Sequence, residues 1–383
     1  MTRAFDSFLQ SIDEIKLFMK FESFAQGFFS KDINEFKINA ELSDKVESIL
    51  SSLPKRSLIQ SKVYLYKSII ISLYGSLERY VEDVIKEYLE NLVSFCGDFE
   101  KLPAEVRKNY ISVSLDYLSK TQKKKAVSSS VIESLTKSAI DNLYFFCKNE
   151  FNSKMNYDAF TAHTSNFRYD SINDIFLRVG IQNICGEALN DGELKNALCE
   201  KNYLLKDTDK KVLESILTSE LGDLAQRRNE IAHGVPILDI DSYDLAISRV
   251  KLLEFCVKAI DSVVMKSLAQ HMYSVSSVFS IGKPTKLFIE NSRIGFEHIN
   301  SLNEKCGSVL SSEVSHMIRV GGAFFAVNIN SPNKVLIGNI KSIFYDGRLV
   351  PELMLPTPNS VVISLDIAVR DSFKRRDFQF LVV

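Results

Sequence analysis

Several features that would assign this 383-residue chain to a special class are missing from its sequence. It has no tryptophan, only 15 glycines and 8 prolines, and no two of its six cysteines stand closer than fourteen positions. The composition excludes a collagen-like repeat, a wholly disordered chain and a disulfide mini-scaffold, and the cysteine spacing excludes CxxC zinc knuckles and redox pairs. We therefore expect the cysteines to be buried thiols of a reducing compartment.

The sequence also lacks an excess of charge and a long hydrophobic run. Lys and Arg (47) nearly cancel Asp and Glu (48), so a net charge of −1 gives no global attraction to nucleic acid or to an anionic membrane. The longest uncharged apolar stretch, near Ser68–Leu77, is too short for a bilayer, and Asp6 stands where a signal peptide needs apolar residues. We expect a cytoplasmic protein without a membrane partner.

The periodicity of the apolar residues changes near Met272. Before it, apolar residues recur every three or four positions, which predicts helices near residues 3–25, 43–53, 57–95, 104–119, 131–148, 171–180, 211–233 and 241–270. After it, runs rich in Val, Ile and Phe predict strands near residues 277–281, 286–290, 322–329, 335–345, 361–365 and 378–383. The sequence thus predicts a mainly α chain, with an all-α domain of residues 1–272 and a small β-rich sandwich or barrel of residues 273–383.

Common catalytic motifs are absent as well. No GxxxxGK[ST], HExxH or GxSxG occurs, so phosphate-loop chemistry, zinc proteolysis and serine hydrolysis lack sequence support. Four of the five histidines have no neighbouring acid, base or metal-ligand spacing: His163, His271, His298 and His316. His233 differs, because it ends the segment Arg-Asn-Glu-Ile-Ala-His in the last turns of an amphipathic helix.

Arg228 stands in register with the apolar stripe of that helix. The stripe runs through Leu213, Leu217, Leu221 and Leu224, and a further step of four reaches Arg228. A guanidinium on a buried face is costly unless it is paired or the face opens onto a ligand or partner subunit. Basic residues at a helix C-terminus also complement the helix dipole, which is the structural alternative.

The candidate side chains of this segment do not all lie on one face of the helix. Asn229 and His233 are four positions apart and lie on one side of an ideal helix. Arg228 and His233 are five apart, which leaves them about 140° from each other. They converge only if the last turn is distorted or if a second copy of the helix completes the site.

The segment from Arg228 to His233 resembles the signature of the HEPN superfamily, in which an arginine and a polar residue precede a histidine. Two further segments, residues 71–81 and 160–168, resemble an early long helix and a loop of the RiboL-PSP type of HEPN domain. The resemblance implies a HEPN-like helical bundle followed by the small β-rich domain. It does not extend to the β-rich tail.

HEPN domains with this signature are typically metal-independent endoribonucleases that work as dimers. The resemblance therefore implies RNA as substrate, no cofactor or metal, a 2′,3′-cyclic phosphate product and a homodimer. His233 suits acid/base transfer, Arg228 suits binding of the phosphate as charge develops, and Asn229 suits a bond to phosphate or to the histidine. It also implies a toxin or anti-phage defence effector, with an antitoxin or phage-derived trigger bound by the C-terminal domain.

Arg227 and Glu78 are secondary candidates. We expect Arg227 to be a solvated neighbour able to bind phosphate, and Glu78 to border a helix interface or to bond to the active-site helix. His163, Asn166 and Arg168 are expected to order their loop rather than to touch RNA. The alternative function is a non-catalytic HEPN scaffold that binds RNA or protein.

Overall fold

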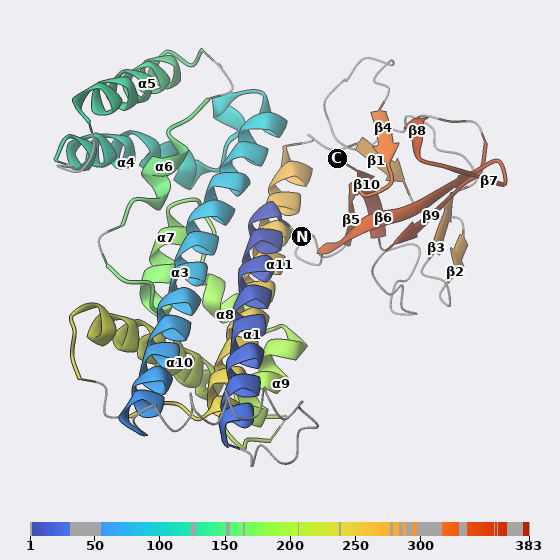
Figure 1. Ribbon diagram of the computed structural model, residues 1–383. Helices are drawn as coiled ribbons and strands as arrows, with labels where there is room; N and C mark the ends of the chain where they lie inside the picture. The colour runs from blue at the N-terminus through green and yellow to red at the C-terminus, as the bar shows by residue number, and fades with distance from the viewer. Residues whose placement is uncertain are drawn as a thin grey trace, which may run out of the picture. The chain divides into compact units, whose positions relative to one another are not determined.

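The computed structural model describes most of the helical part and selected segments of the strand-rich part. The described residues are 2–30, 55–123, 128–150, 154–163, 165–205, 207–236, 239–275, 279–282, 286–288, 293–296, 316–328, 335–355, 357, 359–365 and 378–382. The chain is mainly helical and ends in a strand-rich part, which confirms the predicted fold class (Figure 1). The helix predicted over residues 43–53 lies outside the described residues.

The long helices predicted from periodicity form close to the expected bounds. They are α1 (Arg3–Ser30), α3 (Lys55–Cys96), α4 (Ala104–Gln122), α5 (Ser129–Cys147), α7 (Tyr169–Leu177), α10 (Lys210–Ala232) and α11 (Tyr243–Ser274). Four shorter helices were not predicted, because short segments hold few repeats of the apolar period. These are α6 (Tyr157–Thr161), α8 (Ile184–Ala188), α9 (Gly192–Lys201) and the 3₁₀ helix η2 (Phe99–Lys101).

The chain divides into two compact units. The first comprises Thr2–Glu87 and Tyr157–Asp261, and the second contains Tyr88–Asn156 and Ser262–Val383. Helices α3 and α11 contribute residues to both units. The predicted domain boundary after residue 272 follows a different criterion, the change from helices to strands, and stays a prediction.

Apolar side chains at helical spacing form the core of the first unit. On α10 the predicted stripe is buried, since Leu213, Leu217, Leu221 and Leu224 are each at most 3% exposed. On α3 the predicted face is buried too: Tyr66, Ile70, Leu73, Leu77, Val81 and Val84. Each such leucine contributes about 1.5–3 kcal/mol to stability through burial, so this packing fixes how α3 and α10 are rotated about their axes.

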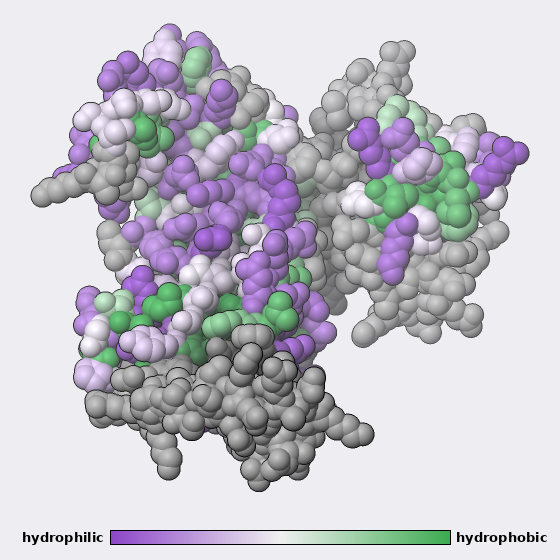
Figure 2. Space-filling view, viewed as in Figure 1, coloured by the Kyte–Doolittle hydropathy of each residue, from purple (hydrophilic) through white to green (hydrophobic). Residues whose placement is uncertain are grey.

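In the second unit, α4 and α5 form a helical hairpin held at its base by Asn156. The Asn156 N–H donates to the Tyr110 hydroxyl at 3.1 Å, and its amide nitrogen donates to Ser114 Oγ at 3.1 Å and to the Ala139 carbonyl at 3.0 Å. The outer surface of the hairpin carries exposed apolar side chains: Ile111, Leu115, Val131, Leu135, Ile140 and Tyr144. Figure 2 shows that hydrophobic side chains on the visible face of the helices gather in separate patches between hydrophilic ones.

The described strands pair antiparallel in an eight-stranded and a two-stranded sheet. The larger sheet contains β1 (Phe279–Gly282), β2 (Lys286–Phe288), β3 (Arg293–Phe296), β5 (Ala323–Asn328), β6 (Val335–Tyr345), β9 (Val361–Leu365) and β10 (Phe378–Val382), with β7 (Arg348–Val350) on β6. The smaller one pairs β4 (His316–Arg319) with β8 (Glu352–Leu355). Asp346 and Gly347, with φ of 49° and 77°, form the two-residue turn between β6 and β7.

Four cysteines are buried thiols as expected, and one is not. Cys96, Cys185, Cys199 and Cys256 are buried, whereas Cys147 is exposed. Cys147 is the last residue of α5, at the end of the hairpin. Cys306 lies outside the described residues. Among the helices that the structure describes, none combines the length and the apolarity needed to cross a membrane.

Candidate active site

The end of α10 is a regular helix closed by a glycine. The His233 N–H donates to the Asn229 carbonyl at 2.9 Å, the Gly234 N–H to the Ile231 carbonyl at 3.1 Å, and the Val235 N–H to the Glu230 carbonyl at 2.9 Å. The last two bonds form a Schellman motif, in which Gly234 takes the left-handed conformation (φ 71°) that residues with a Cβ rarely adopt. The last turn is therefore not distorted, and one of the two predicted routes to convergence is not observed.

His233 follows this helix as its C-terminal cap and is exposed. Within the described part of the chain, its imidazole makes no hydrogen bond or ion pair with another side chain. Both ring nitrogens are consequently available to a ligand.

Arg228 is half-buried, and an aromatic ring takes the place of a carboxylate partner. Its guanidinium carbon lies 5.2 Å from the centroid of the Tyr74 ring, and Nη1 donates to Asn229 Oδ1 at 3.3 Å. Among the described residues, no carboxylate lies within ion-pair distance of it. The cation–π contact explains how a guanidinium is accommodated in register with an apolar stripe while its charge is not neutralised.

Asn229 is oriented by a residue from the loop before α7. Its Oδ1 accepts a hydrogen bond from Asn166 Nδ2 at 2.7 Å, in addition to the bond from Arg228. In the described residues, the Asn229 amide nitrogen has no acceptor. Because the oxygen is occupied twice, the amide nitrogen is the donor that Asn229 can offer to a ligand.

The loop of residues 165–168 is fixed by bonds to its backbone. The Phe167 N–H donates to the Tyr74 hydroxyl at 2.8 Å, the Arg168 N–H to Ser171 Oγ at 2.6 Å, and Ser171 Oγ to the Asn166 carbonyl at 2.8 Å. The loop is ordered by hydrogen bonds, as expected, and it also reaches the candidate site through Asn166.

His163 lies against two carboxylates of α3. Its Nε2 is 3.7 Å from Glu78 Oε1 and 3.4 Å from Glu82 Oε1, and its ring packs on Phe167 with 4.2 Å between centroids. Burial raises the pKa of Glu82, and the neighbouring Glu78 raises it further. The sequence showed no acid near His163, because its partners stand about eighty positions earlier. In the described residues Glu78 faces His163 and forms no bond to α10.

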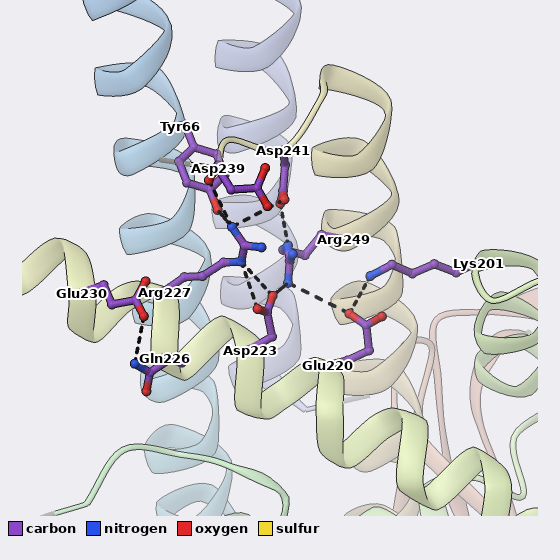
Figure 3. Close-up of polar contacts among 10 residues, drawn as sticks. All are labelled: Tyr66, Lys201, Glu220, Asp223, Gln226, Arg227, Glu230, Asp239, Asp241 and Arg249. Carbon is purple, nitrogen blue, oxygen red and sulfur yellow. Dashed lines mark hydrogen bonds and ion pairs between the residues drawn. The ribbon is translucent and has the colours of Figure 1, made fainter. Parts of the chain in front are cut away.

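Arg227 differs from the solvated neighbour that the sequence predicted. Its Nε donates to both oxygens of Asp223 at 3.0 and 2.9 Å, and Nη1 donates to the Tyr66 hydroxyl and lies 3.7 Å from Asp241 Oδ1 (Figure 3). The pKa of Arg227 is raised despite its burial, because Asp223, Tyr66 and Asp241 stabilise the charged form. Only 21% of its side chain is exposed, and both Nε and Nη1 are committed to acceptors of the protein.

A second arginine completes this cluster. Arg249 binds Asp223 at 2.7 Å and Asp241 at 3.0 Å, and the Asp241 side chain is only 2% exposed (Figure 3). Two arginines thus alternate with two aspartates and join α10, α11 and the segment that follows His233. The cluster fixes the chain on both sides of the Schellman turn at Gly234.

The supporting residues Tyr74 and Asn166 are not distinguished as site residues by the sequence. Tyr74 was indistinguishable from the buried face of α3, and Asn166 was expected only to order its loop. The signal that pointed to Asn166 was its place in the segment of residues 160–168.

In the described residues, no three His, Cys, Asp or Glu side chains gather in a group able to hold a metal ion.

Comparison with protein families gives a match over more than half of the chain. The RiboL-PSP-HEPN family model matches residues 30–266, which contain α3, α10 and the loop before α7. A comparison with curated proteins finds no match.

Proposed function

Because the chain belongs to the RiboL-PSP-HEPN family, whose superfamily is associated with RNA cleavage or RNA binding, we propose that it is a metal-independent endoribonuclease. Its site consists of Arg228, Asn229 and His233. The observation that carries this proposal is the contrast between two consecutive arginines. Arg227 is paired with carboxylates, whereas the charge of Arg228 rests on Tyr74 without a described carboxylate partner.

The three side chains fit the transesterification of RNA. The 2′-oxygen loses its proton and attacks phosphorus, the bond from phosphorus to the 5′-oxygen breaks, and that oxygen gains a proton. His233 moves a proton at one of these oxygens, because imidazole is the side chain that most often serves as a general acid or base. Arg228 and the Asn229 amide nitrogen donate to the phosphate oxygens as negative charge develops. The products are a 2′,3′-cyclic phosphate and a 5′-hydroxyl.

The active form in this proposal is a homodimer. The undistorted last turn of α10 leaves Arg228 and His233 well separated around one helix. A two-fold axis beside α10 brings the Arg228 of one protomer toward the His233 of its partner. It also supplies two histidines, one to accept the proton of the 2′-hydroxyl and one to protonate the leaving oxygen.

We assign the biological role by family. The proposal is a toxin or an anti-phage defence effector, in which the strand-rich C-terminal part binds an antitoxin or a phage-derived trigger. That part lies beyond the residues matched by the family, so RNA cleavage by the matched residues does not account for it.

A cleavage assay in excess EDTA tests the proposed activity. The full chain should cleave single-stranded RNA, leave a 2′,3′-cyclic phosphate, and fail on RNA whose 2′-oxygens are methylated. His233→Ala should reduce the rate about 10²–10⁴-fold, the scale of a positioned acid or base. Thr218→Ala, an exposed change on the same helix, is the control and should leave the rate unchanged.

Two outcomes would contradict the proposal. Cleavage that requires Mg²⁺ and leaves a 3′-hydroxyl would refute the mechanism. RNA that is bound but never cut, by wild type and His233→Ala alike, would identify a non-catalytic scaffold.

A further inference from the structure

Arg168 carries an exposed guanidinium beside the candidate active site. It precedes α7, and its Nη2 reaches the side chain of Gln226 on α10 at 3.5 Å, the outer limit of a hydrogen bond. Within the described residues, no carboxylate lies within ion-pair distance of Arg168. Its positive charge therefore faces solvent without compensation.

The order of the loop does not depend on this guanidinium. The backbone N–H of Arg168 and the carbonyl of Asn166 both bond to Ser171 Oγ, and the Phe167 N–H bonds to Tyr74. The loop-ordering role expected from the sequence is thus performed by main-chain groups. In the described residues, the long charged side chain of Arg168 makes only the weak contact with Gln226.

Three other arginines of the same unit are committed to acceptors. Arg178 donates to the carbonyls of Phe160 and Ala162 at 3.2 and 2.9 Å, while Arg227 and Arg249 are held by aspartates. Arg168 and Arg228 have in common that their strongest contacts are with uncharged groups.

Arg168 and Arg228 also lie close to each other, at the end of α10 and near Tyr74. Gln226, the contact of Arg168, stands two positions before Arg228 on α10. Burial raises the pKa of Tyr74 to about 12, and the positive charges of Arg228 and Arg168 both oppose that rise. The two guanidinium groups therefore lie near one buried hydroxyl, together with the carboxylate of Glu78.

We propose that Arg168 binds a second RNA phosphate, adjacent to the phosphate held by Arg228. The inference rests on the proposed function, since it takes RNA as the ligand of the same site. A single-stranded RNA presents phosphates at regular intervals, so a chain placed with one phosphate at Arg228 offers another to a neighbouring guanidinium. The planar fork of arginine donors fits two phosphate oxygens at once.

The salt dependence of RNA binding tests the contact between Arg168 and a phosphate in a variant that does not cleave RNA. In the His233→Ala background, a fluorescently labelled single-stranded RNA is titrated with full chain at several KCl concentrations, and anisotropy gives Kd. Arg168→Gln should raise Kd about tenfold and reduce the slope of log Kd against log[KCl] by about 0.7, the value for one phosphate contact on a single strand. Arg168→Lys keeps the charge and should keep the slope.

Lys211→Gln is the matched control. It removes one positive charge from the exposed start of α10, about 25 Å along the helix from Arg228 at 1.5 Å per residue, and should change the slope little. Equal effects of Arg168→Gln and Lys211→Gln would overturn the inference, as would a wild-type protein that binds no RNA. If Arg168→Gln changes the slope as expected but the wild-type chain does not cleave RNA in excess EDTA, the inference stands and the proposed nuclease function fails.

Discussion

Arg227 and Arg228 are consecutive on α10, and alanine at each position should produce opposite phenotypes. Arg227→Ala removes two bonds to Asp223, the bond to Tyr66 and the ion pair with Asp241. Because Asp223 is 40% exposed, its pair contributes only about 0.5 kcal/mol. The bonds to Tyr66 and the buried Asp241 contribute about 1.5 kcal/mol more.

Arg227→Ala should therefore lower the free energy of unfolding by about 2 kcal/mol in total. This is less than the 3–5 kcal/mol expected when a buried ion loses its last partner, because Arg249 still binds Asp223 and Asp241. At about 2–4 °C per kcal/mol, Arg227→Ala should lower Tm by about 4–8 °C. Arg228→Ala removes one cation–π contact and one hydrogen bond, worth about 1 kcal/mol, and should change Tm by half as much or less.

Activity should show the reverse order. Arg228→Ala should reduce RNA cleavage about 10²–10³-fold, corresponding to the loss of one donor to the developing charge. Arg227→Ala should keep cleavage within a few-fold at a temperature where it is folded. Thermal melting by circular dichroism and cleavage in EDTA measure the two effects on the same samples. A larger loss of Tm for Arg228→Ala than for Arg227→Ala would refute the reasoning, because Arg228 would then be the structural cation.

Three further predictions concern Asn166, His271 and the oligomeric state. Asn166→Ala should slow cleavage about tenfold through loss of the bond to Asn229, and it should add little to the larger loss caused by Asn229→Ala; additive effects in this double-mutant cycle would contradict the coupling. Burial lowers the pKa of His271, so the folded state resists its protonation, and stability should be full above the unfolded pKa of about 6.5 and decrease as pH falls below it. His271→Gln should make Tm less dependent on pH between 7 and 5, and an unchanged dependence would argue against this contribution. Light scattering at micromolar concentration should give a dimer, and a monomer that still cleaves RNA would exclude the two-fold site.

The long helices were predictable because their burial repeats locally in the sequence. Ten buried positions on α3 and α10 follow steps of three and four, and these steps alone indicate which side of each helix faces the core. The short helix α8 begins after Asn183, whose left-handed φ of 44° has no local sequence signal as clear as a glycine. Its five residues are too few for a periodic pattern.

The candidate site was predictable only where its residues are neighbours in sequence. The arginine, asparagine and histidine at the end of α10 are local, and so is the glycine that stops the helix. The distinction between Arg227 and Arg228 is partly local, because Asp223 stands four positions before Arg227 whereas Leu224 stands four before Arg228. Tyr74 and Asp241 are not sequence neighbours of the arginines, so only the packed fold shows that Arg228 lies on an aromatic ring and that Arg227 also reaches a buried aspartate.

In the loop before α7, the path of the backbone does not depend on the exposed side chains. Main-chain bonds to Ser171 and Tyr74 hold it in place, while Ser165 and Arg168 are exposed. Substitution at these two positions alters what the loop presents without altering its path. In evolutionary terms, such a loop permits the ligand preference of a lineage to diverge quickly, because new side chains at its rim do not remove the bonds that hold the backbone.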